Sequence, residues 1–161
     1  MTQQVDLQEL TRAQTRAEAE GRQCVVGAVV INEQGQAFAQ KRAASRRLFP
    51  NCWDLIGGHV EAGETLVEAL RREIREETGW ELSRIVSLIA VFDWEDDQGG
   101  LRRELDFLVQ VTGDLAHPRL EWTKNSEFRW LSPDELDVLQ ENRQPEDSII
   151  CEIVKKGLSG R

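Results

Sequence analysis

The segment from Leu66 to Thr78 constrains the fold of this chain more than any other. Its apolar side chains recur at helical spacing and form one stripe on a helix surface, made of Leu66, Val67, Leu70 and Ile74. Thr65 and Glu68 have the spacing of a capping box, in which each side chain accepts a hydrogen bond from the other's backbone N–H. Gly79 stands where a left-handed C-terminal cap belongs. The segment therefore predicts an amphipathic helix that packs on a core through one face.

Strands and helices follow one another along the rest of the chain. A continuous apolar run predicts a buried strand at 24–31, and after a turn at 32–35 the residues 36–42 alternate like the second arm of a hairpin. The other predicted strands are 85–94, 104–111 and 128–131, and the other predicted helices are 5–20, one that starts at Ser132, and 148–156. This order predicts an α/β sandwich around a mixed sheet. We expect a single domain over residues 1–161, in which residues 1–21 are a helical extension.

The charge balance excludes one class of partner. The chain has 29 acidic and 20 basic residues, a net charge of -9, so its surface repels the phosphate backbone of DNA and RNA. No apolar run reaches the length of a membrane span, and the N-terminus lacks the apolar stretch of a signal peptide. The cysteines Cys24, Cys52 and Cys151 are widely spaced and predict reduced thiols. We therefore expect a cytoplasmic protein that binds neither nucleic-acid polymers nor membranes.

Three glutamates concentrate negative charge on the predicted helix. Glu73, Glu76 and Glu77 lie at positions i, i+3 and i+4 and share one face, apart from the apolar stripe. Three carboxylates this close repel one another unless a cation lies among them, and oxygen ligands at this density favour Mg²⁺ or Mn²⁺. An acidic helix run is more often a solvated face. The glycines before this helix, Gly57-Gly58 and Gly63, favour a ligand site, because they let the backbone approach a ligand closely.

The spacing of these residues resembles the signature of the Nudix hydrolase superfamily. Gly58, five residues, Glu64, seven residues and then Arg72-Glu73-Ile74-Arg75-Glu76-Glu77-Thr78-Gly79 reproduce each defining glycine and polar position of the Nudix box. Trp80 departs from the aliphatic residue that usually ends the box, and it reads as a core residue. The resemblance implies an α/β/α sandwich around a mixed β-sheet, with the box as a loop–helix–loop motif. It also implies hydrolysis of a nucleoside diphosphate linked to another group.

The resemblance assigns roles to residues of the box. Glu73, Glu76 and Glu77 would bind Mg²⁺, with Mn²⁺ as an alternative, and the backbone carbonyl of Gly57 would join them. Arg72 would orient the acids, and Glu64 would support the loop. The general base differs among family members, and besides the box glutamates the later acids Glu127 and Glu121 are candidates; either is also an ordinary surface acid.

Residues outside the box are candidates for substrate contacts. Arg42, Arg46 and Arg47 belong to a basic segment that could hold phosphates, or that could balance nearby acids. A nucleobase could stack on Trp94 or Trp122, which adjoin polar loops, and Glu127 is a further candidate for a substrate contact. Glu146 and Asp147 could accept hydrogen bonds from a base, although acids that cap the last helix would look the same. His59 has no second histidine or cysteine beside it, so we assign it no ligand role.

The motifs of several family subclasses are absent, so a free nucleoside triphosphate, cleaved to monophosphate and pyrophosphate, is the preferred substrate. One rival is an isopentenyl diphosphate isomerase, which requires a cysteine where this chain has Gly57. The other is a non-catalytic nucleotide-binding module, a class that has lost box glutamates. We expect a monomer or a homodimer.

Overall fold

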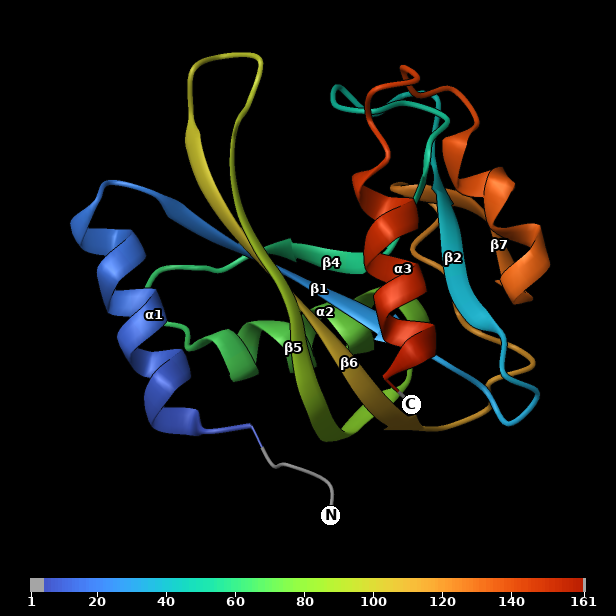
Figure 1. Ribbon diagram of the computed structural model, residues 1–161, viewed down its shortest axis with the longest axis horizontal. Helices are drawn as coiled ribbons and strands as arrows, with labels where there is room; N and C mark the ends of the chain where they lie inside the picture. The colour runs from blue at the N-terminus through green and yellow to red at the C-terminus, as the bar shows by residue number, and fades with distance from the viewer. Residues whose placement is uncertain (1–4, 161) are drawn as a thin grey trace.

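The computed structural model describes residues 5–160 (Figure 1). Its elements follow in the order α1 (Leu7–Ala19), β1 (Gln23–Val30), β2 (Ala37–Arg42), β3 (Trp53–Asp54), β4 (Ile56–His59), α2 (Leu66–Thr78), β5 (Glu81–Glu95), β6 (Leu101–Thr112), β7 (Asn125–Leu131), the 3-10 helix η1 (Pro133–Gln140) and α3 (Ile149–Ser159). The predicted helices and strands are all present. The short strands β3 and β4 were not predicted, because two residues are too few to show a strand pattern in β3 and the glycine pair obscures it in β4.

The strands form two sheets. The first has the order β4-β1-β6-β5 and is mixed, because β1 and β6 run parallel while the other pairs are antiparallel. The second sheet has the order β3-β2-β7. The hairpin predicted between β1 and β2 is wrong in its pairing. A single bridge, Ile31 to Ala37, joins these segments, and β2 then crosses into the second sheet to pair with β3 and β7.

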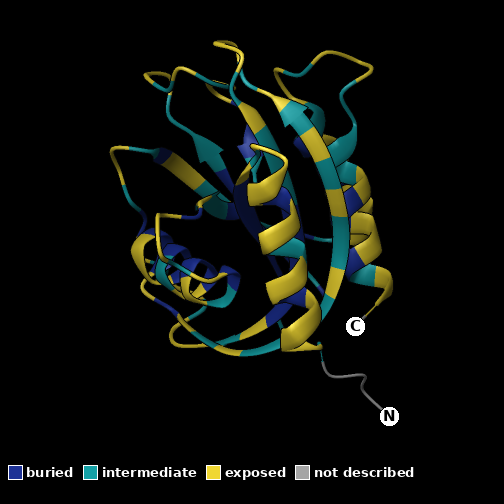
Figure 2. Cartoon of the chain, turned by 90° about the vertical axis from the view of Figure 1, so that its left-hand side faces the viewer, coloured by how far each residue is buried: buried dark blue, intermediate teal, exposed yellow. Residues whose placement is uncertain are grey.

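Helices cover both faces of the first sheet, as the α/β/α sandwich requires. The helices α1 and α2 pack on one face through a core that includes Leu70, Ile74 and Leu105. The helix α3 packs on the other face through a core that includes Val29, Ile153 and Val154. Figure 2 shows α1 with most of its surface exposed, in agreement with its polar composition.

The helix α2 begins and ends where its sequence predicts. Thr65 and Glu68 form both hydrogen bonds of the capping box, at 3.1 Å each. An N-cap such as Thr65 contributes about 1 kcal/mol to helix stability. At the other end of the helix, the C-cap Gly79 adopts the left-handed conformation with φ of 78°. After the helix, Trp80 is buried and packs edge-on against Phe38, so its side chain is part of the core as predicted. The core therefore holds α2 at both ends and along its apolar stripe.

Two further observations concern the chain as a whole. Within residues 5–160, no helix is both long and apolar enough to cross a membrane. Cys24, Cys52 and Cys151 are free thiols, as predicted from their spacing.

Candidate active site

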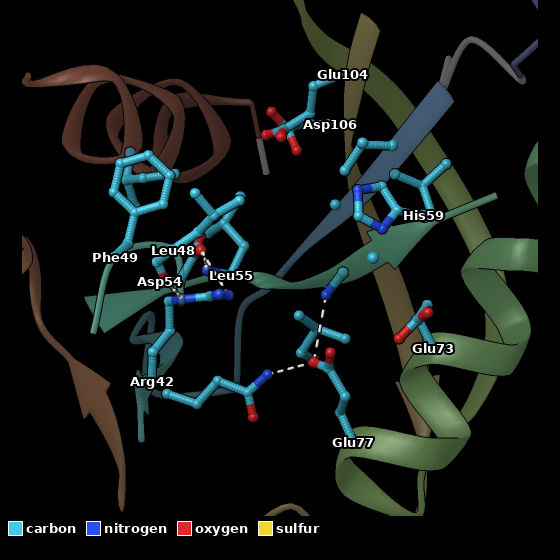
Figure 3. A pocket seen from close by; sticks show the side chains of 18 of the residues that line it. Arg42, Leu48, Phe49, Asp54, Leu55, His59, Glu73, Glu77, Glu104 and Asp106 are labelled. Atoms are coloured by element: carbon cyan, nitrogen blue, oxygen red, sulfur yellow. Dashed lines mark hydrogen bonds and ion pairs between the residues drawn. The ribbon is translucent and has the colours of Figure 1, made fainter. Parts of the chain in front are cut away.

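A cavity of about 620 Å³ opens beside β4, where the two sheets meet. Side chains from α2, β2, β3, β5, β6 and the start of α3 line it together with the loop before β3. Its size lies within the range of small-molecule sites. Figure 3 shows Glu73 and Glu77 at the α2 side of this cavity and the acids Glu104 and Asp106 at a different side, away from α2. The cavity thus joins the box glutamates to acids from a distant part of the sequence.

The three box glutamates differ in their exposure. Glu73 and Glu77 are each 5% exposed, because they flank the side of α2 that packs toward the sheets. Glu76 is exposed at the mouth of the cavity, and all three residues line it. The spacing of i, i+3 and i+4 therefore brings the carboxylates to one cavity, as the sequence predicted.

The carboxyl group of Glu77 is held by neighbours from both sheets. The Gln40 side-chain amide donates a hydrogen bond to Glu77 Oε2, and the Gly57 backbone N–H donates to the same atom at 3.3 Å (dashed lines in Figure 3). Burial raises the pKa of Glu77 well above its usual value, and repulsion from Glu73 raises it further. Glu77 is thus a buried acid, and the two groups that donate hydrogen bonds to it carry no positive charge to stabilise its ionised form.

Glu73 has one oxygen with a partner and one without. Arg72 Nη1 donates to Glu73 Oε1 at 2.8 Å, while Glu73 Oε2 is buried and has no hydrogen-bond partner. Burial raises the pKa of Glu73, although Arg72 opposes the shift. A side chain on Gly58 would collide with this carboxylate. The glycine therefore allows β4 to lie directly against Glu73, as the close approach predicted for Gly57-Gly58 requires.

Arg72 links the box loop to the helix. It makes a two-pronged pair with Glu64, with Nε to Oε2 at 2.7 Å and Nη2 to Oε1 at 2.9 Å. It also reaches Glu76 at 3.3 Å and the His59 carbonyl at 3.0 Å. The Arg72 guanidinium lowers the pKa of Glu64, whose Oε1 accepts a hydrogen bond from the Glu61 N–H. Arg72 thus joins three carboxylates and a backbone carbonyl, in keeping with the positioning role that the resemblance implies.

The donor set of this cavity fits a divalent cation such as Mg²⁺. Among the described residues, no three Asp, Glu, His or Cys side chains already stand together as a metal centre. Arg72 holds Glu73, and Gln40 holds Glu77, which accounts for their separation. The unpartnered Oε2 of Glu73 and the raised pKa of Glu77 are nevertheless the features that a bound cation would relieve. These ligands are hard oxygens, which suit Mg²⁺ or Mn²⁺.

The predicted basic residues divide into two groups. Arg42 and Arg46 line the cavity, and the Arg42 Nε donates to the Leu48 carbonyl at 2.8 Å. Arg47 does not line it. Its guanidinium pairs instead with Asp97 in the turn between β5 and β6, because the loop directs adjacent side chains in different directions. Lys124 was not predicted as a candidate and lines the cavity beside the glutamates.

Among the predicted tryptophans and the later acids Glu127 and Glu121, only Trp94 lines the cavity. Trp94 lines the cavity, whereas Trp122 is 68% exposed and lies outside its lining. The structure does not bring Glu127 or Glu121 to the cavity. Glu127 is exposed on β7 beside Arg129 at 3.9 Å, and Glu121 pairs with Lys124 at 3.4 Å. A base role for either acid therefore lacks geometric support.

Of the two acidic candidates near the last helix, only one lines the cavity. Asp147 lines the cavity and pairs with Arg143 at 3.1 Å, while Glu146 is exposed and lies outside the lining. His59 lines the cavity as well, and burial lowers its pKa. The observed partner of Asp147 is thus an arginine of the cavity wall.

Several polar residues that line the cavity were not predicted from the sequence: Gln40, Asp54, Glu104, Asp106 and Arg143. Gln40 and Asp106 are 1% and 0% exposed. A signal for Asp106 was present, because Gly27 interrupts an otherwise large-residue apolar strand and leaves room for a neighbouring side chain. Asp54 and Glu104 adjoin apolar residues and look like the outer face of an ordinary strand, and Arg143 lies in a polar loop.

Comparison with known proteins gives one consistent result. The family model of the NUDIX domain matches residues 21–153. The chain is 35% identical over 123 residues to the nucleoside triphosphatase NudI of Escherichia coli O17:K52:H18, covering 71% of this chain and 86% of that protein. It is 34% identical over 129 residues to the nucleoside triphosphatase NudI of Salmonella agona, covering 75% of this chain and 90% of that protein.

Among solved structures, a MutT NUDIX hydrolase from Burkholderia pseudomallei superposes with a TM-score of 0.67 at 28% identity. The match covers 83% of this chain and 98% of that one. A NUDIX hydrolase from Nitrosomonas europaea superposes with a TM-score of 0.69 at 22% identity, covering 86% of this chain and 90% of that one, and supports the fold.

Proposed function

This chain belongs to the Nudix hydrolase family and is a pyrophosphohydrolase, and from that premise we propose that it hydrolyses a nucleoside triphosphate to the monophosphate and pyrophosphate with the help of Mg²⁺. The observation that carries the proposal is the shared cavity. It combines the box acids Glu73, Glu76 and Glu77 with the cations Arg42, Arg46 and Lys124. The relatives named nucleoside triphosphatase favour a triphosphate over other nucleoside diphosphate derivatives.

The box acids and the Gly57 carbonyl would hold the cation. When bound, the cation neutralises phosphate oxygens and makes a water molecule more acidic. Mn²⁺ would fit the same oxygen ligands.

The protein's own residues bind and orient the substrate. Arg42, Arg46 and Lys124 bring positive charge to a chain of net charge -9, which allows a phosphate chain to lie beside the acids. Arg72 keeps Glu73 and Glu76 directed toward the cavity through hydrogen bonds of 2.8 and 3.3 Å. Glu73 and Glu77 are equally buried, and burial raises the pKa of both, so a bound cation would stabilise the ionised forms that burial disfavours.

The isomerase reading loses its support in the cavity. That chemistry requires a cysteine beside the box, and none of the described lining residues is a cysteine. Cys52 is buried with its Sγ 3.4 Å from the Asn142 carbonyl. The hydrolase reading, by contrast, uses only side chains that line the cavity.

The test is product release from a substrate panel with Mg²⁺, each reaction repeated with EDTA. The panel contains standard and oxidised nucleoside triphosphates, ADP-ribose, nucleotide sugars and dinucleoside polyphosphates. We expect EDTA-sensitive turnover of triphosphates, with monophosphate and pyrophosphate in equal amounts. Release of inorganic phosphate from a triphosphate, or turnover confined to ADP-ribose or nucleotide sugars, would contradict the proposed reaction. A folded protein that turns over no member of the panel would contradict the proposed substrate class.

A further inference from the structure

A second group of acids lies in the same cavity, away from the box. Glu104 and Asp106 are two positions apart on β6, so both side chains leave the same face of the sheet. Leu105 and Phe107 point the other way, into the core beneath α2. The two acids therefore face the α3 side of the sheet, where Ile149 and Ile150 complete the cavity wall. Figure 3 shows their carboxyl groups side by side, apart from Glu73 and Glu77.

Asp106 is buried without a conventional partner. It is 0% exposed, and within the described chain no amide, guanidinium or hydroxyl group donates a hydrogen bond to either of its oxygens. Its neighbour at hydrogen-bonding range is the Glu104 carboxyl group. Gly27 is its register partner on β1, and a side chain there would collide with Asp106 Oδ1. The sheet thus makes room for a buried carboxyl group, although this group accepts no hydrogen bond from an N–H or hydroxyl group of the described residues.

The carboxyl groups of Glu104 and Asp106 lie within hydrogen-bonding range of each other, and two carboxyl groups form such a bond only when one of them carries a proton. Burial and mutual repulsion raise the pKa of Asp106 well above its usual value, and burial together with Asp54 raises that of Glu104 to about 7. Because the pair uses that O–H internally, its remaining oxygens are hydrogen-bond acceptors, and Asp54 adds further acceptors from β3. A ligand that forms hydrogen bonds with these oxygens must therefore present N–H groups to them.

Aromatic and aliphatic side chains enclose this end of the cavity. Phe92 and Trp94 from β5 line it together with Ile149 and Ile150 from α3. Flat apolar surfaces of this kind suit the faces of a nucleobase. The cations Arg42, Arg46 and Lys124 line the same cavity, so a nucleotide could place its phosphates near them and its base near β6.

We propose that the Glu104–Asp106 pair is the base-recognition subsite of this cavity and that it selects nucleobases carrying an exocyclic amino group. Cytosine and adenine carry an amino group whose N–H donors match the acceptor oxygens of the pair. Uracil offers one N–H between two carbonyl oxygens, and those oxygens would face carboxyl oxygens. This inference rests on the proposed nucleotide substrate and adds the part of the site that discriminates among bases.

Substrate pairs that differ at one group test the proposal. CTP and UTP differ at the 4-position, and ATP and ITP differ at the 6-position, with an amino group in the first of each pair and an oxygen in the second. We expect kcat/KM for the amino member to exceed that for its partner on the order of tenfold, the scale of one hydrogen bond to a charged group. Equal values for both pairs would overturn the proposal.

Variants then assign the preference to the acid pair. In Glu104→Gln and in Asp106→Asn, the ratio of kcat/KM between amino and oxo partners should fall to about 1, through a higher KM for the amino member. Asp93→Asn is the matched control, because Asp93 lies on β5 outside this cavity and pairs with Arg103 at 2.7 Å. Its ratio should equal that of the unaltered protein. A preference that persists in both cavity variants would overturn the assignment.

Binding separates this inference from the proposed hydrolysis. Calorimetry with CMP and UMP, without added metal, reports base recognition even if no triphosphate is cleaved. Tighter binding of CMP that is lost in Glu104→Gln supports the subsite, whatever the substrate panel shows. Equal binding of CMP and UMP, or no binding of either, overturns it. The proposed function fails instead when the panel shows no metal-dependent release of pyrophosphate.

Discussion

Gly27 on β1 and Asp106 on β6 are register partners in the parallel part of the first sheet, and the missing side chain of the glycine is the space that the aspartate carboxyl group fills. The strand β1 is otherwise a run of buried apolar residues from Cys24 to Val30. A glycine inside such a strand weakens it, and the strand retains it here because the buried acid lies against it.

Gly27→Ala should therefore destabilise the fold by about 1–3 kcal/mol, the usual cost of overpacking a filled core. The cost should fall below about 0.5 kcal/mol when the same change is made in an Asp106→Ala background, because the collision partner is then gone. Urea unfolding of the two single variants and the double variant measures this coupling. An additive result would show that Asp106 is not what the glycine accommodates.

The adjacent glycines of β4 should respond differently to alanine. A side chain on Gly57 would collide with the Val26 carbonyl, a backbone atom that cannot move, so Gly57→Ala should cost about 1–3 kcal/mol of stability. A side chain on Gly58 meets the end of the Glu73 side chain, which can rotate away. Gly58→Ala should change stability by less than about 1 kcal/mol.

Gly58→Ala should affect hydrolysis more than it affects stability. Displacement of Glu73 in Gly58→Ala should lower hydrolysis about 10- to 100-fold, the range found when groups that support a metal site are disturbed. Chemical unfolding and pyrophosphate release are measured on the same preparations. Full activity in Gly58→Ala would contradict a role for Glu73.

Glu77→Gln should separate activity from stability. Burial and Glu73 raise the pKa of Glu77, so the fold favours its neutral form, and a neutral amide should leave the unfolding free energy unchanged or higher. The amide oxygen can still accept hydrogen bonds from Gln40 and Gly57. Metal-dependent hydrolysis should fall at least about 100-fold. Thermal unfolding and pyrophosphate release together check this, and retained activity would remove Glu77 from the proposed metal ligands.

Glu104 should make stability depend on pH. Its pKa is about 7 in the folded protein against 4.5 for a free glutamate, so the folded state holds the proton more tightly. Below about pH 4.5 both states are protonated and the contribution is complete; it is lost as the pH rises through 7. The loss is at most about 3 kcal/mol.

The variant Glu104→Gln isolates this contribution from those of other acids. The stability of the unaltered protein relative to Glu104→Gln should decline between pH 5 and 8, as followed by urea unfolding at each pH. The groups around the Glu104 carboxyl group set how steeply stability declines with pH, and they are Asp54, Asp106, Trp94 and Arg143. A pH-independent difference would contradict the raised pKa.

Local patterns in the sequence determined the elements and the box. The stripe of Leu66, Leu70 and Ile74, the capping pair and Gly79 predicted α2 with its observed bounds, because helix periodicity and caps depend on neighbours along the chain. The same spacing predicted that Glu73, Glu76 and Glu77 face one side. Resemblance to the Nudix box added the family, which the comparisons confirm.

The three-dimensional arrangement decided which residues outside the box reach the cavity. Arg42 and Arg46 reach it and Arg47 does not, although the three are close in sequence and alike in chemistry. The pairing of β2 with β3 and β7 rather than with β1 also depends on partners far away in the chain. Such pairings depend on the packing of whole layers, which short-range patterns do not contain.

The acids of β6 illustrate the same division. From the sequence alone, Glu104 and Asp106 alternate with apolar residues and look like the solvated face of a strand. Only the parallel pairing of β6 with β1, and the placement of α3 over that face, bring these two carboxyl groups together in the cavity wall and bury Asp106. The sequence by itself determined α2, the longer strands and the box. The tertiary structure decided which charges are buried together, because burial depends on segments that meet only after the chain has folded.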